Sequence, residues 1–235
     1  MNLFNRIAGI FLNPQPTTKA ISEKPVWVDA LIIVLLATAL FSFFTMPYQQ
    51  KDTLEMMKNN ISMQERMGEE RFNQYIEGLE NPSQSGTMLR SFALAPISLV
   101  VGFLFQCLII VGLGRLSTTE GKFMQVFAVF LHARFIDVIL GGALRSFLVF
   151  SRKGFMSTTT GLAMFFPKME IATPAFIVLS QIDFFQLWAY GVLGIGLSHV
   201  FKVDLKKGLI FAYAVWALKT VLYIALGLFS LRWMQ

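Results

Sequence analysis

Five long apolar stretches divide this chain, and three of them carry charged residues near their centres: Arg134 with Asp137, Asp183, and Lys219. A charged side chain at the centre of a bilayer costs at least about 2.5–3.5 kcal/mol. Four such residues imply helices that pack together and neutralise one another's charges. The chain is also 55% hydrophobic and only 14% charged, well below the charged fraction of soluble domains. The sequence therefore predicts an all-α polytopic membrane protein, a bundle of five transmembrane helices.

Each stretch is near or above the roughly 20 residues that a helix needs to cross the hydrocarbon core. The third stretch is long enough to be tilted, or kinked at Gly141-Gly142. An odd number of spans places the two termini on opposite sides of the membrane. The expected spans are about 26–46, 92–113, 123–150, 174–200 and 208–231.

The distribution of Lys and Arg predicts the orientation, because both concentrate on the cytoplasmic side of short loops. With the N-terminus inside, eight of them are cytoplasmic, and four lie in the outer short loop and tail. We expect a plasma (bacterial inner) membrane protein with a cytoplasmic N-terminus and an outside C-terminus, although the basic loop at Arg152-Lys153 opposes this. Most of the +6 net charge lies at span ends, which indicates headgroup contact and argues against nucleic-acid binding.

Two segments outside the spans have apolar residues at helical spacing. In residues 1–25 the pattern predicts a short amphipathic helix with Arg6 away from its apolar face. This helix either lies in the cytoplasmic interface or packs on the protein's own bundle. In residues 48–90 the pattern predicts one or two helices outside the membrane. These cap the bundle, lie on the outer leaflet or bind a partner.

No catalytic, cofactor or metal motif is complete in this sequence. Gly121-Lys122 lacks the upstream glycine and the following Ser or Thr of a phosphate-binding loop. Cys107 is the single cysteine, so neither a disulfide nor a cysteine-based zinc site is expected. The two imidazoles, His132 and His199, are too few and too far apart in sequence for a histidine metal site. We expect a protein without enzymatic activity, cofactor or metal.

The charges inside the spans predict a common site. At 1.5 Å per residue, three of them are expected about 16–17 Å from the cytoplasmic face. Asp137 follows Arg134 by three residues, on a helix face that also includes Arg145, so those two can pair. The predicted cluster has no net charge and is either a proton or ion relay, a polar cavity for a solute, or a salt-bridge set that fixes helix register. Its members are Arg134, Asp137, Asp183 and Lys219, with Gln186 and His132 as neighbours.

The chain contains several short recognisable segments: Leu3–Pro14, Ile21–Pro25, Gln125–Ala128, and Ile182–Trp188 with Val192–Leu197. These segments resemble the Yip family (Ypt-interacting proteins), in particular its bacterial members. The resemblance implies five spans and a cytoplasmic N-terminus. In eukaryotes the family is linked to Golgi and endoplasmic-reticulum trafficking and to Rab-type GTPases, often as oligomers. The Asp-Leu-Tyr-Gly-Pro motif of eukaryotic members is absent here, which argues against GTPase binding.

Two functional hypotheses follow. The first is a non-enzymatic integral membrane protein that organises membrane or binds partners. Its partners would be the lipid bilayer and either further copies of itself or other membrane proteins. The alternative is a small ion- or proton-coupled transporter that uses the charge cluster inside the membrane.

Overall fold

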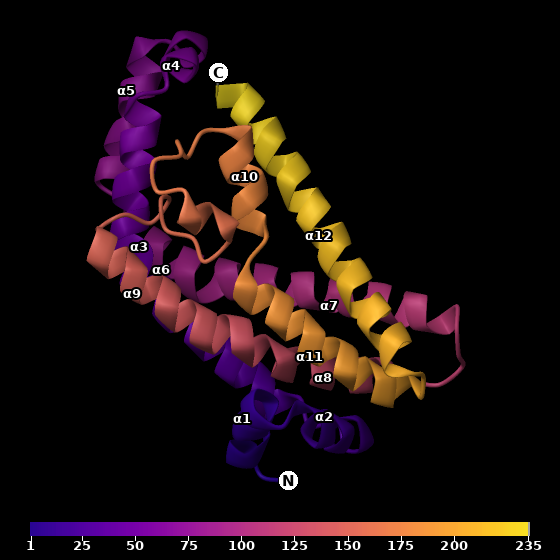
Figure 1. Ribbon diagram of the computed structural model, residues 1–235. Coiled ribbons are helices and arrows are strands. Elements are labelled where there is room, and N and C mark those ends of the chain that lie inside the picture. The colour runs from indigo at the N-terminus through magenta and orange to yellow at the C-terminus, as the bar shows by residue number, and fades with distance from the viewer. Residues whose placement is uncertain (235) are drawn as a thin grey trace.

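A computed structural model describes residues 1–234, apart from the side chains at positions 87, 90, 91, 233 and 234. Within this part of the chain, five helical segments are long and apolar enough to cross a membrane. Figure 1 shows them crossing one another at different angles in one bundle. The all-α polytopic architecture predicted from the sequence is therefore confirmed. The segments are Val28–Lys58, Phe92–Arg115, Phe123–Arg152, Phe184–Phe201 and Leu205–Arg232.

The third segment changes its helical geometry near its middle. Helix α8 (Phe123–Phe135) passes into the π-helical turn η2 (Ile136–Gly141) and then into α9 (Gly142–Arg152). The irregular turn ends where the sequence suggested a kink. A Cβ atom on Gly142 would lie 2.6 Å from the ring of Phe41, so glycine lets α9 approach α3 (Val28–Lys58) closely.

The fourth expected span, 174–200, is two helices. Helix α10 (Pro174–Gln181) ends before Asp183, and α11 (Phe184–Phe201) begins after it. Asp183 caps α11, because its Oδ1 atom accepts a hydrogen bond from the backbone N–H of Gln186 at 3.0 Å. Aspartate favours such capping positions over helix interiors. Asp183 therefore lies at a helix start instead of in the middle of a continuous span.

The chain between α9 and α10 folds back against this break. The N–H of Leu162, in the 3₁₀ turn η3 (Leu162–Phe165), donates to the carbonyl of Ile182 at 3.0 Å. A Cβ on Gly161 would lie 2.5 Å from the carbonyl oxygen of Ser180, so glycine is required for this approach. Irregular backbone is tolerated at membrane depth only where protein covers its polar groups. Here two irregular segments satisfy part of each other's hydrogen bonding.

Helices α11 and α12 (Leu205–Met234) pack with their backbones close together. A Cβ on Gly194 would lie 2.8 Å from the Cα of Leu209, and one on Gly208 would lie 2.8 Å from the backbone nitrogen of Ser198. Small residues allow this kind of approach between membrane helices, where dispersion contacts replace the hydrophobic effect. The remaining long helix, α7 (Ala95–Arg115), packs on α8 and α12.

The N-terminal segment forms two helices, α1 (Leu3–Leu12) and α2 (Pro14–Glu23), and both pack on the bundle. Ile10 and Ile21 are completely or almost completely buried there. Phe4 and Leu12 remain exposed on the other side of α1. One side of α1 therefore packs on the bundle, and a second apolar side is left outside.

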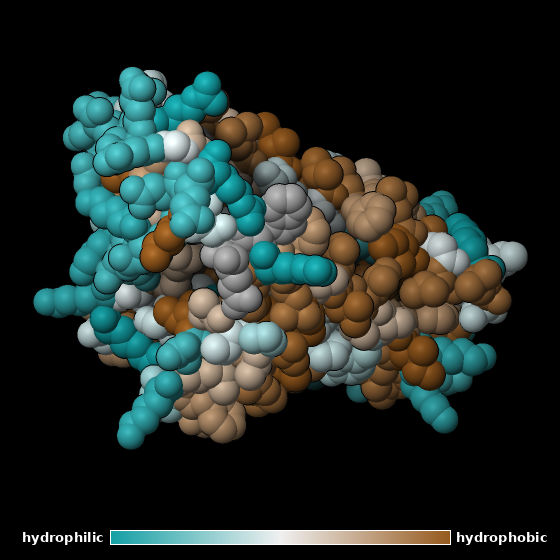
Figure 2. Space-filling view, turned by 90° about the horizontal axis from the view of Figure 1, so that it is seen from above, coloured by the Kyte–Doolittle hydropathy of each residue, from teal (hydrophilic) through white to brown (hydrophobic). Residues whose placement is uncertain are grey.

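The segment expected to lie outside the spans, residues 48–90, starts as a direct continuation of the first spanning helix. Helix α3 continues through Pro47 to Lys58, and then α4 (Ile61–Met67), α5 (Glu69–Glu80) and α6 (Gln84–Leu89) follow. Buried Phe72 and Ile76 belong to α5, which packs along the extension of α3 (Figure 1). In Figure 2 hydrophilic residues gather at this side of the molecule, and hydrophobic residues dominate the middle.

Candidate functional site

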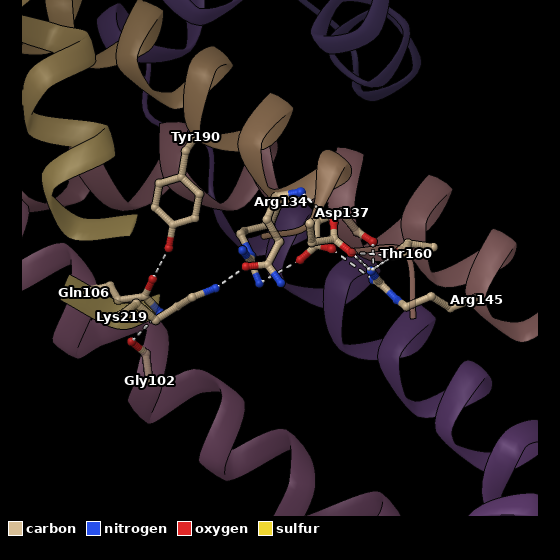
Figure 3. Close-up of polar contacts among 10 residues, drawn as sticks. Gly102, Gln106, Arg134, Asp137, Arg145, Thr160, Tyr190 and Lys219 are labelled. Atoms are coloured by element: carbon tan, nitrogen blue, oxygen red, sulfur yellow. Dashed lines mark hydrogen bonds and ion pairs between the residues drawn. The ribbon is translucent and has the colours of Figure 1, made fainter. Parts of the chain in front are cut away.

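A buried carboxylate, Asp137, lies at the centre of an ionic cluster (Figure 3). Arg134 Nη2 is 3.1 Å from its Oδ2 atom, and Arg145 Nη2 is 2.9 Å from its Oδ1 atom. Arg145 also donates to the backbone carbonyl of Asp137 at 2.8 Å. The pair with Arg134 joins adjacent turns of one helix. Arg145 reaches back across the π-turn η2, and its contacts with Asp137 stabilise the irregular middle of this helical segment.

The basic partner of Asp183 is Arg145, which was not among the predicted members of the cluster. Arg145 Nη1 lies 3.4 Å from Asp183 Oδ2, and the hydroxyl of buried Thr160 donates to the same oxygen. Asp183 was predicted as a member of the cluster, and Arg145 is the base that links it to Asp137. The physical reason is the break in the fourth span, which turns the carboxylate toward the loop before η3 and toward α9.

Lys219 of α12 is held by neutral groups. Its Nζ atom donates to Gln186 Oε1 and lies 5.7 Å from the ring centre of Tyr190 and 5.9 Å from that of Tyr223. Electron-rich ring faces attract ammonium groups at such distances. Tyr190 in turn donates to Gln106 Oε1 of α7. Gln186 thus contacts Lys219, and Figure 3 shows the chain of contacts linking α7, α11 and α12.

Adding Arg145 changes the charge balance of the site. The structure brings together three bases and two acids, so the prediction that the charges cancel is wrong. Arg134 Nε and Nη1 are buried without a hydrogen-bond partner among the described residues. The Arg134 guanidinium lies 5.3 Å from the ring centre of Phe103. The cluster is therefore a buried region with one excess positive charge, partly offset by aromatic faces.

His132 belongs to a second buried polar group. Its Nδ1 atom lies 2.7 Å from the carbonyl oxygen of Ala128 and must carry the proton, because a carbonyl can only accept. Its Nε2 atom then accepts from Arg6 Nη1 at 3.2 Å. Arg6 is also ion-paired with Asp29. His132 was predicted as a neighbour of the ionic cluster, but its observed contacts help to fasten α1 to α3 and α8.

Sequence reasoning missed several members of these two groups, for different reasons. Arg145 had a visible signal, because it shares a helix face with Arg134 and Asp137. Arg6 had none, because the helical pattern placed it away from the apolar face of its segment, whereas the structure buries it. Thr160 had none, because loop position does not reveal a fold-back. Among the described residues, no group of three or more His, Cys, Asp or Glu side chains is placed to hold a metal ion.

Comparison with known proteins identifies a family. The model of the Yip1 domain family matches residues 8–227, which include the second half of α1 and nearly all of the five spanning segments. The match is to the family as a whole and confirms the resemblance seen in the short segments. No curated protein matches the chain. No solved structure matches it either.

Proposed function

The chain belongs to the Yip1 domain family, and on that premise we propose that it is a non-enzymatic membrane protein that organises the bilayer by inserting α1 into one leaflet. The observation that carries this proposal is the two-sided character of α1. One side is locked to the bundle through Arg6 and Ile10. The other side presents large apolar residues to its surroundings.

The outward stripe of α1 is well suited to lipid contact. Phe4 is 77% exposed and Leu12 is 84% exposed, and eight residues, or about two helical turns, separate them. Removing a Phe or Leu side chain from water contributes about 1.5–3 kcal/mol each. The two residues together favour burial in the interface by roughly 3–6 kcal/mol. Interfacial helices penetrate about 5–10 Å into the boundary between headgroups and acyl chains.

The docking of α1 makes this insertion rigid. Arg6 bonds to Asp29 and His132, which lie on two different spanning segments. Gly9 packs directly against Thr17 of α2, so that a side chain at position 9 would collide with it. A helix held in this way cannot tilt out of the membrane to relieve crowding. Its volume therefore expands one leaflet next to the bundle, and this asymmetry is the organising effect that we propose.

The proposed location is a bacterial plasma membrane, with the N-terminus in the cytoplasm and the C-terminus outside. The support for this orientation is the excess of Lys and Arg on that side of the short loops. In this arrangement α1 acts on the cytoplasmic leaflet. The bilayer is the partner that the proposal requires. Self-association or contact with other membrane proteins through α4 and α5 is compatible with it, because both helices lie outside the bundle.

The test uses full-length protein reconstituted into liposomes. Wild type should reduce vesicle diameter or form tubules, as seen by cryo-electron microscopy, and the double variant Phe4→Ser/Leu12→Ser should not. A matched control, Ile61→Ser/Tyr75→Ser, removes two exposed apolar residues of α4 and α5 and should behave as wild type. Deformation by the α1 double variant equal to that of wild type would refute the proposal.

A second candidate function is ion- or proton-coupled transport. It is favoured by the excess positive charge of the ionic cluster and by the broken fourth span, since transporters form ion sites at discontinuous helices. This function predicts proton or ion flux in liposomes that is lost in Asp183→Asn. The control Asp204→Asn alters a carboxylate exposed outside the bundle. Flux no greater than that of empty liposomes would exclude this candidate under the conditions tested.

A further inference from the structure

A further polar site, separate from the ionic cluster and from the group around His132, lies at the end of the bundle where four long helices begin or end. A cavity of about 700 Å³ opens there. Its walls come from the end of α2, the loop between α7 and α8, and the turn between α11 and α12. None of its lining residues belongs to the ionic cluster or to α1. The ends of spanning helices lie at the depth of the lipid headgroups, so this cavity faces the phosphate layer of one leaflet.

Basic side chains dominate the cavity lining. It has four Lys or Arg residues and two acids, Glu23 and Glu120. Glu120 is already paired with Lys202 at 3.1 Å. Lys19 and Lys122 line the same space and have no ion-pair partner within the described part of the chain. Two ammonium groups without counter-ions in one concavity create a positive potential that attracts an anion.

The walls of the cavity are held in place by specific contacts. The Arg115 guanidinium donates to the carbonyls of Thr119 and Gly121, the latter at 2.9 Å. Gly121 has a φ of +88°, and a Cβ there would lie 2.5 Å from the Phe201 ring, so glycine is required for two reasons. Gln125 ties α2 to α8 by donating to a backbone carbonyl of α2 at 2.7 Å. The basic groups therefore surround a formed site.

We propose that this cavity binds a phosphate group, carried either by an anionic phospholipid headgroup or by a soluble phosphate compound. The volume is in the range of small-ligand sites, and basic pockets between membrane helices hold phospholipid headgroups. Lys19 and Lys122 supply the charge attraction. The site shares no residue with the outward stripe of α1, so this inference is independent of the proposed function.

The test uses full-length protein in phosphatidylcholine nanodiscs. In one arm a few per cent of phosphatidic acid is added and retained lipid is counted by native mass spectrometry. In the other arm inorganic phosphate is titrated and the thermal midpoint is followed. The variant Lys19→Gln/Lys122→Gln should bind about thirtyfold more weakly, the factor expected for two interfacial lysines. The control Lys206→Gln/Lys207→Gln removes two exposed lysines of the same end that do not line the cavity.

The two arms identify the source of the phosphate. Specific loss of phosphatidic acid in the cavity variant supports a lipid headgroup. Specific loss of the inorganic-phosphate shift supports a soluble compound. All four lysines are exposed, so both double variants should fold and a native thermal midpoint confirms this. Equal weakening in the cavity and control variants, or no binding by wild type in either arm, would overturn the inference.

Discussion

Replacing Asp137 with Asn tests whether the buried ions act as one structural unit. The carboxylate accepts from Arg134 at 3.1 Å and from Arg145 at 2.9 Å, and its side chain is only 7% exposed. Asparagine keeps the shape of the side chain but removes its charge. Two guanidinium groups then lose their shared counter-ion in a region where water cannot replace it.

The size of the effect follows from what each arginine retains. Arg145 is 32% exposed and keeps Asp183 at 3.4 Å as well as Thr160, so its loss is small. Arg134 is 13% exposed and loses the carboxylate that neutralises it. Removing one partner of a buried pair typically costs 3–5 kcal/mol. Because only one of the two arginines is left without a carboxylate, we expect a loss near the lower limit, about 3 kcal/mol.

The chain carries its own reporter for this measurement. Cys107 is the single cysteine and is fully buried, so a thiol-reactive dye labels the protein only as it unfolds. The matched control is Glu80→Gln, which breaks an exposed pair with Lys58 and should cost less than about 1 kcal/mol. The double variant Asp137→Asn/Arg134→Gln should recover part of the stability. Equal thermal midpoints for Asp137→Asn and Glu80→Gln would refute the reasoning.

Three further predictions concern packing and docking. Gly208→Ala should destabilise the protein by about 1–3 kcal/mol, because the added Cβ crowds the backbone of α11. The control Gly102→Ala adds a Cβ that meets no atom within 4 Å, so its thermal midpoint in the same dye assay should equal that of wild type. Arg6→Gln should release α1 and speed amide hydrogen exchange over residues 3–12, and unchanged exchange would contradict the docking role. Asp52→Ala removes the acceptor of two loop N–H groups at 2.7 and 2.8 Å. The loop should then open more easily, so limited proteolysis within residues 153–173 should be faster than in wild type. The control Glu55→Ala should be cleaved there at the wild-type rate.

The class of the protein was readable from the sequence for a physical reason. A bilayer core offers no hydrogen-bond partners, so an apolar stretch of about 20 residues must satisfy its own backbone by forming a helix. Composition therefore sufficed for the five spanning segments. The pair of Arg134 and Asp137 was also readable, because residues three apart meet on any helix. Lipid burial and local helix geometry need no knowledge of the fold.

Only the tertiary structure decided the ionic partners and their charge balance. Asp183 meets Arg145 because the fourth span breaks and a distant loop folds against the break. His132 meets Arg6 across 126 positions of sequence. Contacts of this kind depend on how each helix is rotated about its axis and on where it is interrupted. Packing between remote segments sets both of these, and periodicity within one segment contains no information about them.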